Sequence, residues 1–411
     1  MKIIIKLLTI TLIIAGIVYL QGCGENKDDD KTITFWHFWS EPNQRAVIDS
    51  IIAVFEKENH CKVKVTELSW NDGKTKLMAA FNSKTAPDVL ELGSDWVAQF
   101  SSAGVLLELP KDSMNFDRFV EFSKAPSLWE SKLFALPWVV DTRVLFYNKD
   151  LQSKAGYRQV PPVSFNEILD QAPAINSLPD VYAFGANGSD AHRLYKKVVT
   201  FLWSNGGEIF DAQGLPTIND SKNVGALDFY VMLSKNGFLE TQRQIDAAFV
   251  QGKIAYWISG AWLITKIKNE NPSLNYDICE IPQLYGKQGI SFAGGEYLAI
   301  SKQSKKTVLA KKFLEFMTNG KNSVEFCKRI NEAGFPADKN YFQDEYFRQN
   351  PAKMIFAKQL EHAKMTPVNP HWLEIEEILE NATVKALYGE AVSRGALDEA
   401  QEQVQMLLEK K

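Results

Sequence analysis

Cysteine and histidine are scarce in this sequence, and their scarcity excludes several kinds of scaffold and site. Of the 411 residues, four are cysteine and five are histidine. Apart from Cys23, the cysteines are Cys61, Cys279 and Cys327, and three thiols cannot form a fully paired framework. One bridge among them stays open, but we expect buried free thiols. The histidines show no paired metal-ligand spacing, so we expect neither a metal nor a cofactor.

An excess of positive charge is also absent. Lysine and arginine number 46 against 50 aspartate and glutamate residues, which gives a net charge of −4. Nucleic-acid binding requires a basic face, so we expect no nucleic-acid partner. The stretch "DGKT" lacks the earlier glycine of a phosphate-binding loop, and no G-x-S-x-G elbow occurs. Metal-dependent and nucleophilic catalysis are therefore unsupported.

The N-terminus holds an apolar run that is too short to span a membrane comfortably. Two lysines precede a stretch without charge from Leu7 to Leu20, followed by Gly22 and Cys23. A run of about 14 residues fits a secretory signal, whereas a spanning helix needs about 20. We expect residues 1–22 to be a signal peptide and the polar residues after Cys23 to be a solvated tether. An uncleaved anchor is the alternative, and either would hold the protein outside the cytoplasm.

Strands and helices alternate in the first part of the remaining chain. Strands are expected at 31–36, 61–68 and 87–92, with amphipathic helices at 44–59 and 74–84. This order predicts an α/β fold with a parallel sheet covered by helices on both faces. Ligands of such sheets lie beyond the carboxyl ends of the strands. Residues 37–43 and 93–96 should therefore meet at one edge.

The length of the chain and two later extended segments predict two lobes. Roughly 380 residues after the signal are too many for one simple core. Extended segments at 135–151 and 289–301 would carry the chain from one lobe to the other and back. The second lobe is then inserted in the first. We expect lobe 1 to comprise 32–141 and 296–343, and lobe 2 to comprise 142–295 and 344–411.

Five stretches, in order along the chain, carry a family resemblance: "ITFWHFWSEPN", "APDVLELGSDWVAQFSSAGVLLEL", "LPWVVDTRVLFYNKDL", "AFVQGKIAYWISGAW" and "FAGGEYLAIS". Together they resemble the extracellular solute-binding proteins (family 1) of carbohydrate ABC transporters, the group that contains maltose-binding protein. The resemblance implies a two-lobed periplasmic binding protein (type II) fold with crossover hinge segments, closing on a sugar. It further implies ABC transporter permease subunits as partners, and we expect a monomer.

The stretch "LQGC" resembles the lipobox of bacterial lipoproteins. This resemblance implies that Cys23 is acylated and becomes the mature N-terminus, with residues 23–31 as the lipidated tether. The protein would then be extracytoplasmic and anchored to the cell membrane by lipid, in a periplasm or at a cell surface.

A sugar offers C–H bonds on its ring faces and hydroxyls at its rim, so its site needs aromatic platforms and polar edges. Trp257 lies in an apolar run and is assigned to the core, and His37 is more typical of a core histidine than of a ligand contact. Matching the family's motifs singles out Trp262 as a platform and Asp95 and Asp141 as edges, with Asp95 on the opposite lobe from Trp262. Arg143 is a further ligand-binding candidate that could hold Asp141 in place. Two roles stay open for Glu296, contact with the ligand and support of the hinge. The platform candidates are Trp36, Trp39, Trp138, Trp262 and Trp372, and the edge candidates are Glu41, Asp95, Asp141 and Glu296.

An enzyme of a different class stays open at this point. A glycosidase needs only two carboxylates at a set separation, and the sequence does not exclude a pair that meets between the lobes. The alternative is thus an extracytoplasmic carbohydrate-active enzyme. It would release a product, whereas a binding protein returns the sugar unchanged.

Overall fold

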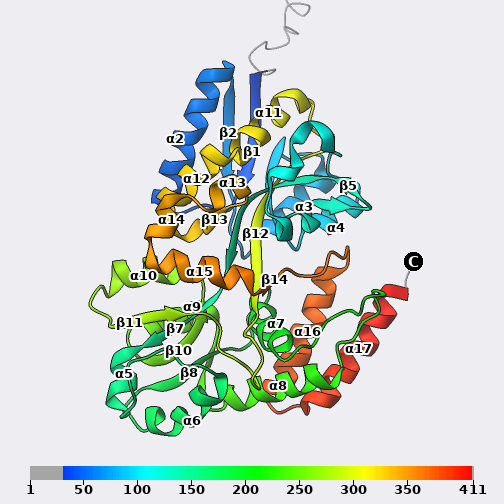
Figure 1. Ribbon diagram of the computed structural model, residues 1–411. Coiled ribbons are helices and arrows are strands. Elements are labelled where there is room, and N and C mark those ends of the chain that lie inside the picture. The colour runs from blue at the N-terminus through cyan, green and yellow to red at the C-terminus, as the bar shows by residue number, and fades with distance from the viewer. Residues whose placement is uncertain (1–30, 410–411) are drawn as a thin grey trace, which may run out of the picture.

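The structure, a computed structural model, describes residues 31–409 and consists of two lobes, each built on one β-sheet (Figure 1). The signal peptide expected at 1–22 and Cys23 lie outside the described residues. In lobe 1 the strand order is β13-β6-β12-β3-β1-β2, and β14 pairs with β12. These strands are β1 (Thr32–His37), β2 (Lys62–Glu67), β3 (Val89–Gly93), β6 (Ala135–Thr142), β12 (Ser291–Ile300), β13 (Phe335–Pro336) and β14 (Ala363–Lys364).

The first three strands confirm the predicted parallel arrangement. β1 pairs in parallel with both β2 and β3, so their carboxyl ends lie at one edge. The helix α2 (Pro42–Asn59) buries its apolar stripe, which consists of Val47, Ile48, Ile51, Ile52 and Phe55. The other helices of lobe 1 are α3 (Gly73–Ser83), α4 (Val97–Ser102), α11 (Thr307–Thr318), α12 (Gly320–Arg329), α13 (Lys339–Phe342) and α14 (Glu345–Gln349), beside a small hairpin of β4 (Leu128–Trp129) and β5 (Lys132–Leu133).

Lobe 2 is built on a five-stranded sheet in the order β11-β7-β10-β8-β9. Its strands are β7 (Val144–Asn148), β8 (Tyr182–Asn187), β9 (Gly237–Glu240), β10 (Ile254–Ser259) and β11 (Tyr276–Cys279). Its helices are α5 (Lys149–Lys154), α6 (Phe165–Asn176), α7 (Leu194–Ser204), α8 (Ser221–Ser234), α9 (Gln242–Val250), α10 (Trp262–Glu270), α16 (Trp372–Leu387) and α17 (Ser393–Glu409). The last two pack on α7 and α8, far along the chain from them (Figure 1).

The chain passes between the lobes more than once. Only Arg143 separates β6, in the lobe-1 sheet, from β7, in the lobe-2 sheet. The chain returns to lobe 1 through β12, which runs antiparallel to both β3 and β6. Its pairing with β6 begins at Ala293, three residues before the expected boundary at Glu296. Helix α15 (Pro351–Glu361) contacts β6, β7, β11 and β12 and so lies against both sheets.

The other expected boundary also differs from the packing. Phe347 on α14 lies 5.0 Å from Phe335 of β13, ring centroid to ring centroid, so the chain still packs on lobe 1 beyond residue 343. Cys61 and Cys327 are buried and Cys279 is half-buried, and all three are free thiols. No helix within residues 31–409 combines the length and the apolar character that a membrane span requires.

Candidate functional site

The first crossing places a charged pair between the lobes. Arg143 Nη1 lies 2.5 Å from Asp141 Oδ2, and the guanidinium carbon stands 4.9 Å from the ring centroid of Trp262. The backbone of Arg143 is itself held, because Ser291 Oγ donates to its carbonyl oxygen (2.8 Å). A side chain at Gly294 would come within 2.8 Å of Asp141 Oδ1, so glycine leaves room for the carboxylate. Arg143 and Asp141, both predicted ligand contacts, thus form an ion pair at the crossing.

Trp262 stands at the start of α10, directly after β10, and remains half-exposed. Its Nε1 donates to Asp246 Oδ2 (3.0 Å), while Trp257 Nε1 donates to Oδ1 of the same carboxylate (2.7 Å). A Cβ atom on Gly260 would lie 1.9 Å from the Trp262 ring, so only glycine lets the ring fold back over the turn. The indole is therefore held in one orientation with part of its surface open. Trp257 is 1% exposed, in the core as predicted.

Two glutamates of lobe 1 carry raised pKa values. Glu296 on β12 is half-buried, and burial together with the nearby Asp141 raises its pKa well above the usual value. Glu91 on β3 is fully buried, and its Oε2 accepts a hydrogen bond from the Phe38 backbone N–H (2.9 Å). Burial raises the pKa of Glu91 to about 8. Both carboxyl groups are therefore held toward the protonated form, in which they can donate as well as accept hydrogen bonds.

Asp95, just beyond β3, is bonded across the lobes. Its Oδ2 accepts from Tyr195 Oη at 2.6 Å, and Lys196 Nζ lies 4.0 Å from the same oxygen. Burial alone would raise the pKa of Asp95, but Lys196, His192 and Tyr195 outweigh it and lower that pKa. A side chain on Gly93 would come within 2.6 Å of Asp95 Oδ1, so here too a glycine makes room for a carboxylate. Asp95 is thus an ionised group whose partners come from lobe 2.

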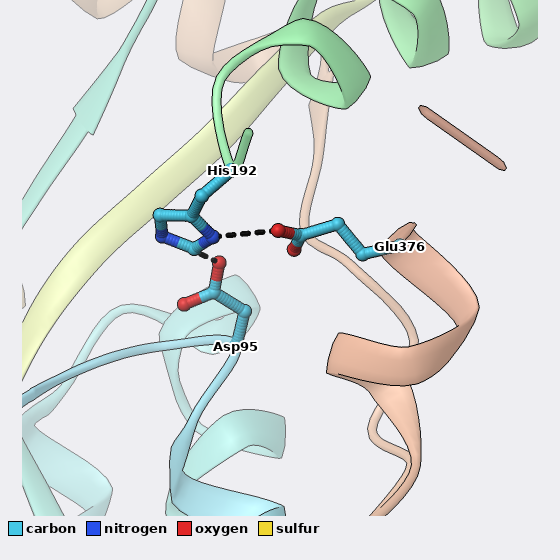
Figure 2. A group of neighbouring side chains, drawn as sticks. All are labelled: Asp95, His192 and Glu376. Carbon is cyan, nitrogen blue, oxygen red and sulfur yellow. Dashed lines mark hydrogen bonds and ion pairs between the residues drawn. The ribbon is translucent and has the colours of Figure 1, made fainter. Parts of the chain in front are cut away.

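His192 and Glu376 of lobe 2 complete this end of the interface, as Figure 2 shows. His192 Nδ1 lies 2.7 Å from Glu376 Oε1. Burial and the charge of Lys196 lower the pKa of His192 to about 3, whereas burial and the charge of Asp95 raise the pKa of Glu376 well above its usual value. The imidazole is therefore neutral at physiological pH. The atoms of Asp95, His192 and Glu376 that could ligate a metal all lie within 4.8 Å of one another.

Lys196 connects the two ends of the interlobe region. Its ammonium lies 5.3 Å from the ring centroid of Phe292, and Arg143 approaches the same ring at 5.2 Å. The side chain of Lys196 is partly exposed, at 17%. Cation–ring contacts and one ion pair thus connect Trp262, through Arg143, Phe292 and Lys196, to Asp95. Such a set of groups can bind a polar ligand that has an apolar face, and binding of this kind breaks no covalent bond of the ligand.

Several of the predicted site residues are buried in packed clusters instead. Trp39 and Trp138 pack with Phe326 in lobe 1, and the Trp138 ring is stacked on Phe326 at 4.4 Å. Trp372 is 1% exposed and meets the Tyr195 ring edge-on at 6.0 Å.

Other predicted residues lie at the surface or inside lobe 1. Trp36 is half-buried on lobe 1. Glu41 is exposed at the N-cap of α2, where its backbone N–H donates to Gln44 Oε1 (3.2 Å). His37 is 1% exposed and its Nδ1 accepts from the Trp39 backbone N–H, as expected for a core histidine.

Tertiary structure brings in residues that the sequence did not reveal: Asp246, Lys196, His192, Tyr195, Phe292 and Glu376. One signal was available, since His192 follows the end of β8, which pairs in parallel with β10 and β9. The strand-end rule that pointed to Asp95 could have found it. Asp246 and Glu376 lie within helices and carry no such signal.

Residues 39–322 match a protein family that is described as bacterial extracellular solute-binding protein. The galactooligosaccharide-binding protein of Bacillus subtilis (strain 168) is 28% identical over 379 residues, which cover 89% of this chain and 87% of that protein. The diacetylchitobiose binding protein DasA of Streptomyces coelicolor is 26% identical over 390 residues, covering 88% and 89%.

Solved structures share the architecture. The GacH receptor of Streptomyces glaucescens GLA.O, described unliganded and in complex with acarbose, superimposes with a TM-score of 0.83 at 24% identity, covering 92% of this chain and 98% of that one. Maltose-bound MalE3 of T. maritima gives a TM-score of 0.81 at 21% identity, covering 92% and 99%. These likenesses confirm the two-lobed fold.

Proposed function

Because the chain belongs to the family of bacterial extracellular solute-binding proteins, we propose that it captures a mono- or oligosaccharide between its two lobes. The family consists of binding proteins that act outside the cytoplasm, which favours binding over the glycosidase alternative. The observation that carries the sugar assignment is the half-exposed Trp262 ring, fixed by Asp246 and flanked by Arg143. An apolar platform beside ionic and carboxyl groups matches a sugar's apolar face and hydroxyl rim.

The proposed contacts follow from exposure. Trp262 supplies the platform, while Asp141, Glu296 and Lys196 are partly exposed and supply polar edges. Arg143 holds Asp141 and can donate from its remaining N–H groups. Asp95 remains a proposed contact, because a ligand hydroxyl could replace Tyr195 at its carboxylate.

Most of the remaining predicted residues are proposed to shape the site without touching the sugar. Trp39, Trp138 and Trp372 are buried and would shape the walls of the site, not stack on the sugar. Trp36, which packs against the cluster that contains Trp96, and Glu41, at the N-cap of α2, stay predicted ligand contacts. The names of the relatives are consistent with a carbohydrate ligand, since those proteins bind galactooligosaccharide and diacetylchitobiose.

A panel of sugars, read by thermal unfolding of the mature protein, tests this function. A ligand present at about 100 times its dissociation constant should add about 2.7 kcal/mol to the free energy of unfolding. We expect a mono- or oligosaccharide to raise the melting temperature and to be recovered unchanged. Stabilisation by phosphate esters or peptides alone would contradict the carbohydrate assignment. Release of a cleaved product would instead support the glycosidase alternative.

The proposed physiological role is delivery of the sugar to the permease of an ABC importer by a lipid-anchored protein. The motif "LQGC" supports acylation of Cys23. Mass spectrometry of the N-terminus from membrane extracts should find a diacylated or triacylated Cys23. A chain that begins at Met1, or a soluble form cleaved downstream of Cys23, would contradict the anchor.

A further inference from the structure

We propose that Asp95, His192 and Glu376 bind one divalent transition-metal ion, with zinc as the reference case, across the boundary between the lobes. Two carboxylates and one imidazole are a donor set that zinc accepts. Both carboxylates point toward the imidazole (Figure 2), and the ligating atoms lie within 4.8 Å of one another. Two ligands of one zinc ion lie at most about 4.3 Å apart, because each bond is about 2.0–2.2 Å. Small side-chain rotations would therefore complete the site.

Unpaired polar atoms point to a missing partner at this position. Glu376 is 4% exposed, yet its Oε2 has no hydrogen-bond partner. Nε2 of His192 makes no hydrogen bond either, and it lies 3.8 Å from Asp95 Oδ2. Buried polar atoms are nearly always paired, because an unpaired one costs about 1–3 kcal/mol. A metal ion bound by both oxygens of Glu376 would satisfy Oε2 as well as replace the proton at Oε1.

The hydrogen bond between His192 Nδ1 and Glu376 Oε1 marks where the ion would sit. At 2.7 Å the two atoms share one proton. The ion would take the place of that proton, which leaves to solvent, and both atoms would then bind the metal through lone pairs. Asp95 supplies the third ligand from lobe 1. No electron is transferred, and water completes the coordination.

Other charged groups around the site set its selectivity. Lys196 approaches Asp95 at 4.0 Å, too far for a hydrogen bond, and its ammonium can withdraw toward the Phe292 ring. Glu380 adds a further carboxylate next to the site, where it accepts the backbone N–H groups of His192 and Tyr195 (both 3.0 Å). Lys74 also interacts electrostatically with Asp95 and Glu376, and a dication would add to the positive charge that the two lysines supply. The nitrogen ligand favours zinc over calcium or magnesium, which prefer oxygen.

The position of the three residues gives the metal a consequence for the lobes. Asp95 follows β3 of lobe 1, whereas His192 and Glu376 belong to lobe 2. The complete ligand set exists only when the lobes are together, so the ion stabilises the closed arrangement. By thermodynamic linkage, a solute that closes the lobes would raise the affinity for zinc by the factor by which zinc raises the affinity for the solute.

Calorimetric titration of the chelator-treated mature protein with zinc alone tests the proposal without any sugar. We expect one equivalent to bind. Asp95→Asn, His192→Gln and Glu376→Gln should each weaken binding at least tenfold, since loss of even an outer-shell partner typically costs 10- to 100-fold. The matched control is Glu374→Gln, the same change at an exposed position on α16, which should bind zinc like the wild type.

Cobalt gives a second measurement, because its visible absorption reports nitrogen and oxygen ligation directly. The wild type should show this band, and His192→Gln should lose it. Circular dichroism identifies any variant that fails to fold, in which case the other two variants and the wild-type cobalt spectrum decide. Absence of saturable zinc binding, or binding that all three site variants leave unchanged, overturns the proposal.

Discussion

The residues that lobe 1 places at the boundary between the lobes are packed differently from those that lobe 2 places there. Lobe 1 presents a packed aromatic cluster, in which Trp39 is 9% and Trp138 1% exposed, with the buried Glu91 nearby. Lobe 2 presents Trp262 and Lys196, which keep part of their surface open. The same residue type, tryptophan, therefore serves as core in one lobe and as proposed platform in the other.

Local backbone geometry explains much of this difference. Trp138 lies within β6, where a side chain must face one side of a sheet covered by helices, and Phe326 of α12 covers it. Trp262 lies at a turn between a strand and a helix, where Gly260 removes the side chain that would block it. A tryptophan at the end of a strand can thus keep part of its ring open, whereas one within a strand that a helix covers serves the core.

The largest expected effect is on stability and belongs to lobe 1. Trp138→Ala should lower the free energy of unfolding by about 3–5 kcal/mol, because it removes a fully buried ring from a packed cluster. Urea denaturation of the protein without sugar measures this loss. Trp262→Ala should cost only about 1 kcal/mol in the same experiment. Equal losses in the two variants would remove the distinction between core and platform.

The next effect is on binding and belongs to lobe 2. Trp262→Ala should weaken sugar binding by about 2–4 kcal/mol, or roughly 30- to 1,000-fold, because stacking on the indole is lost. Calorimetric titration with the sugar identified in the panel measures it. Tyr285→Ala, which removes an exposed aromatic ring of lobe 2, should leave the affinity unchanged. Unchanged affinity in a folded Trp262→Ala protein would refute the proposed platform.

A smaller effect concerns the hydrogen bond between Tyr195 and Asp95, which joins the two lobes. Tyr195→Phe removes the donor that reaches Asp95 across the lobes, and hydrogen bonds to charged groups contribute about 1.5–3 kcal/mol. If that bond stabilises the closed arrangement, sugar affinity should fall by about this amount while the protein without sugar keeps its stability. Calorimetry and urea denaturation measure the two quantities. Tighter binding would instead show that the sugar must break this bond to reach Asp95.

The last effect differs in kind from the others, because it is a change in the slope of stability with pH. Burial raises the pKa of Glu91 to about 8, against 4.5 for an ordinary glutamate. Between these values the folded state keeps a proton that the unfolded state releases, so the stability contributed by Glu91 falls as pH rises, by at most about 1.4 kcal/mol per unit. Glu91→Gln should flatten this decline in denaturation curves measured from pH 5 to 8. Parallel slopes for variant and wild type would contradict a buried, protonated Glu91.

Periodicity, chain order and length sufficed to predict a parallel α/β sheet and two lobes, and the family resemblance supplied the type of fold. The apolar stripe of α2, the parallel strands β1 to β3 and the two crossings were all readable, because each depends on residues close together in the chain. The pairing of Arg143 with Asp141 was readable for the same reason, with one residue between them. The start of α2 was less well defined, since Glu41, a predicted ligand contact, instead occupies its N-cap.

Burial of individual rings and the cross-lobe contacts were decided by tertiary structure alone. No sequence pattern around Trp138 indicates that Phe326, almost 190 residues later, stacks on it. The meeting of Asp95, His192 and Glu376 likewise depends on how three distant segments pack, so no spacing rule could reveal it. A sequence fixes local conformation through short-range sterics and hydrophobic periodicity, whereas a site between lobes is defined by packing contacts that have no local signature.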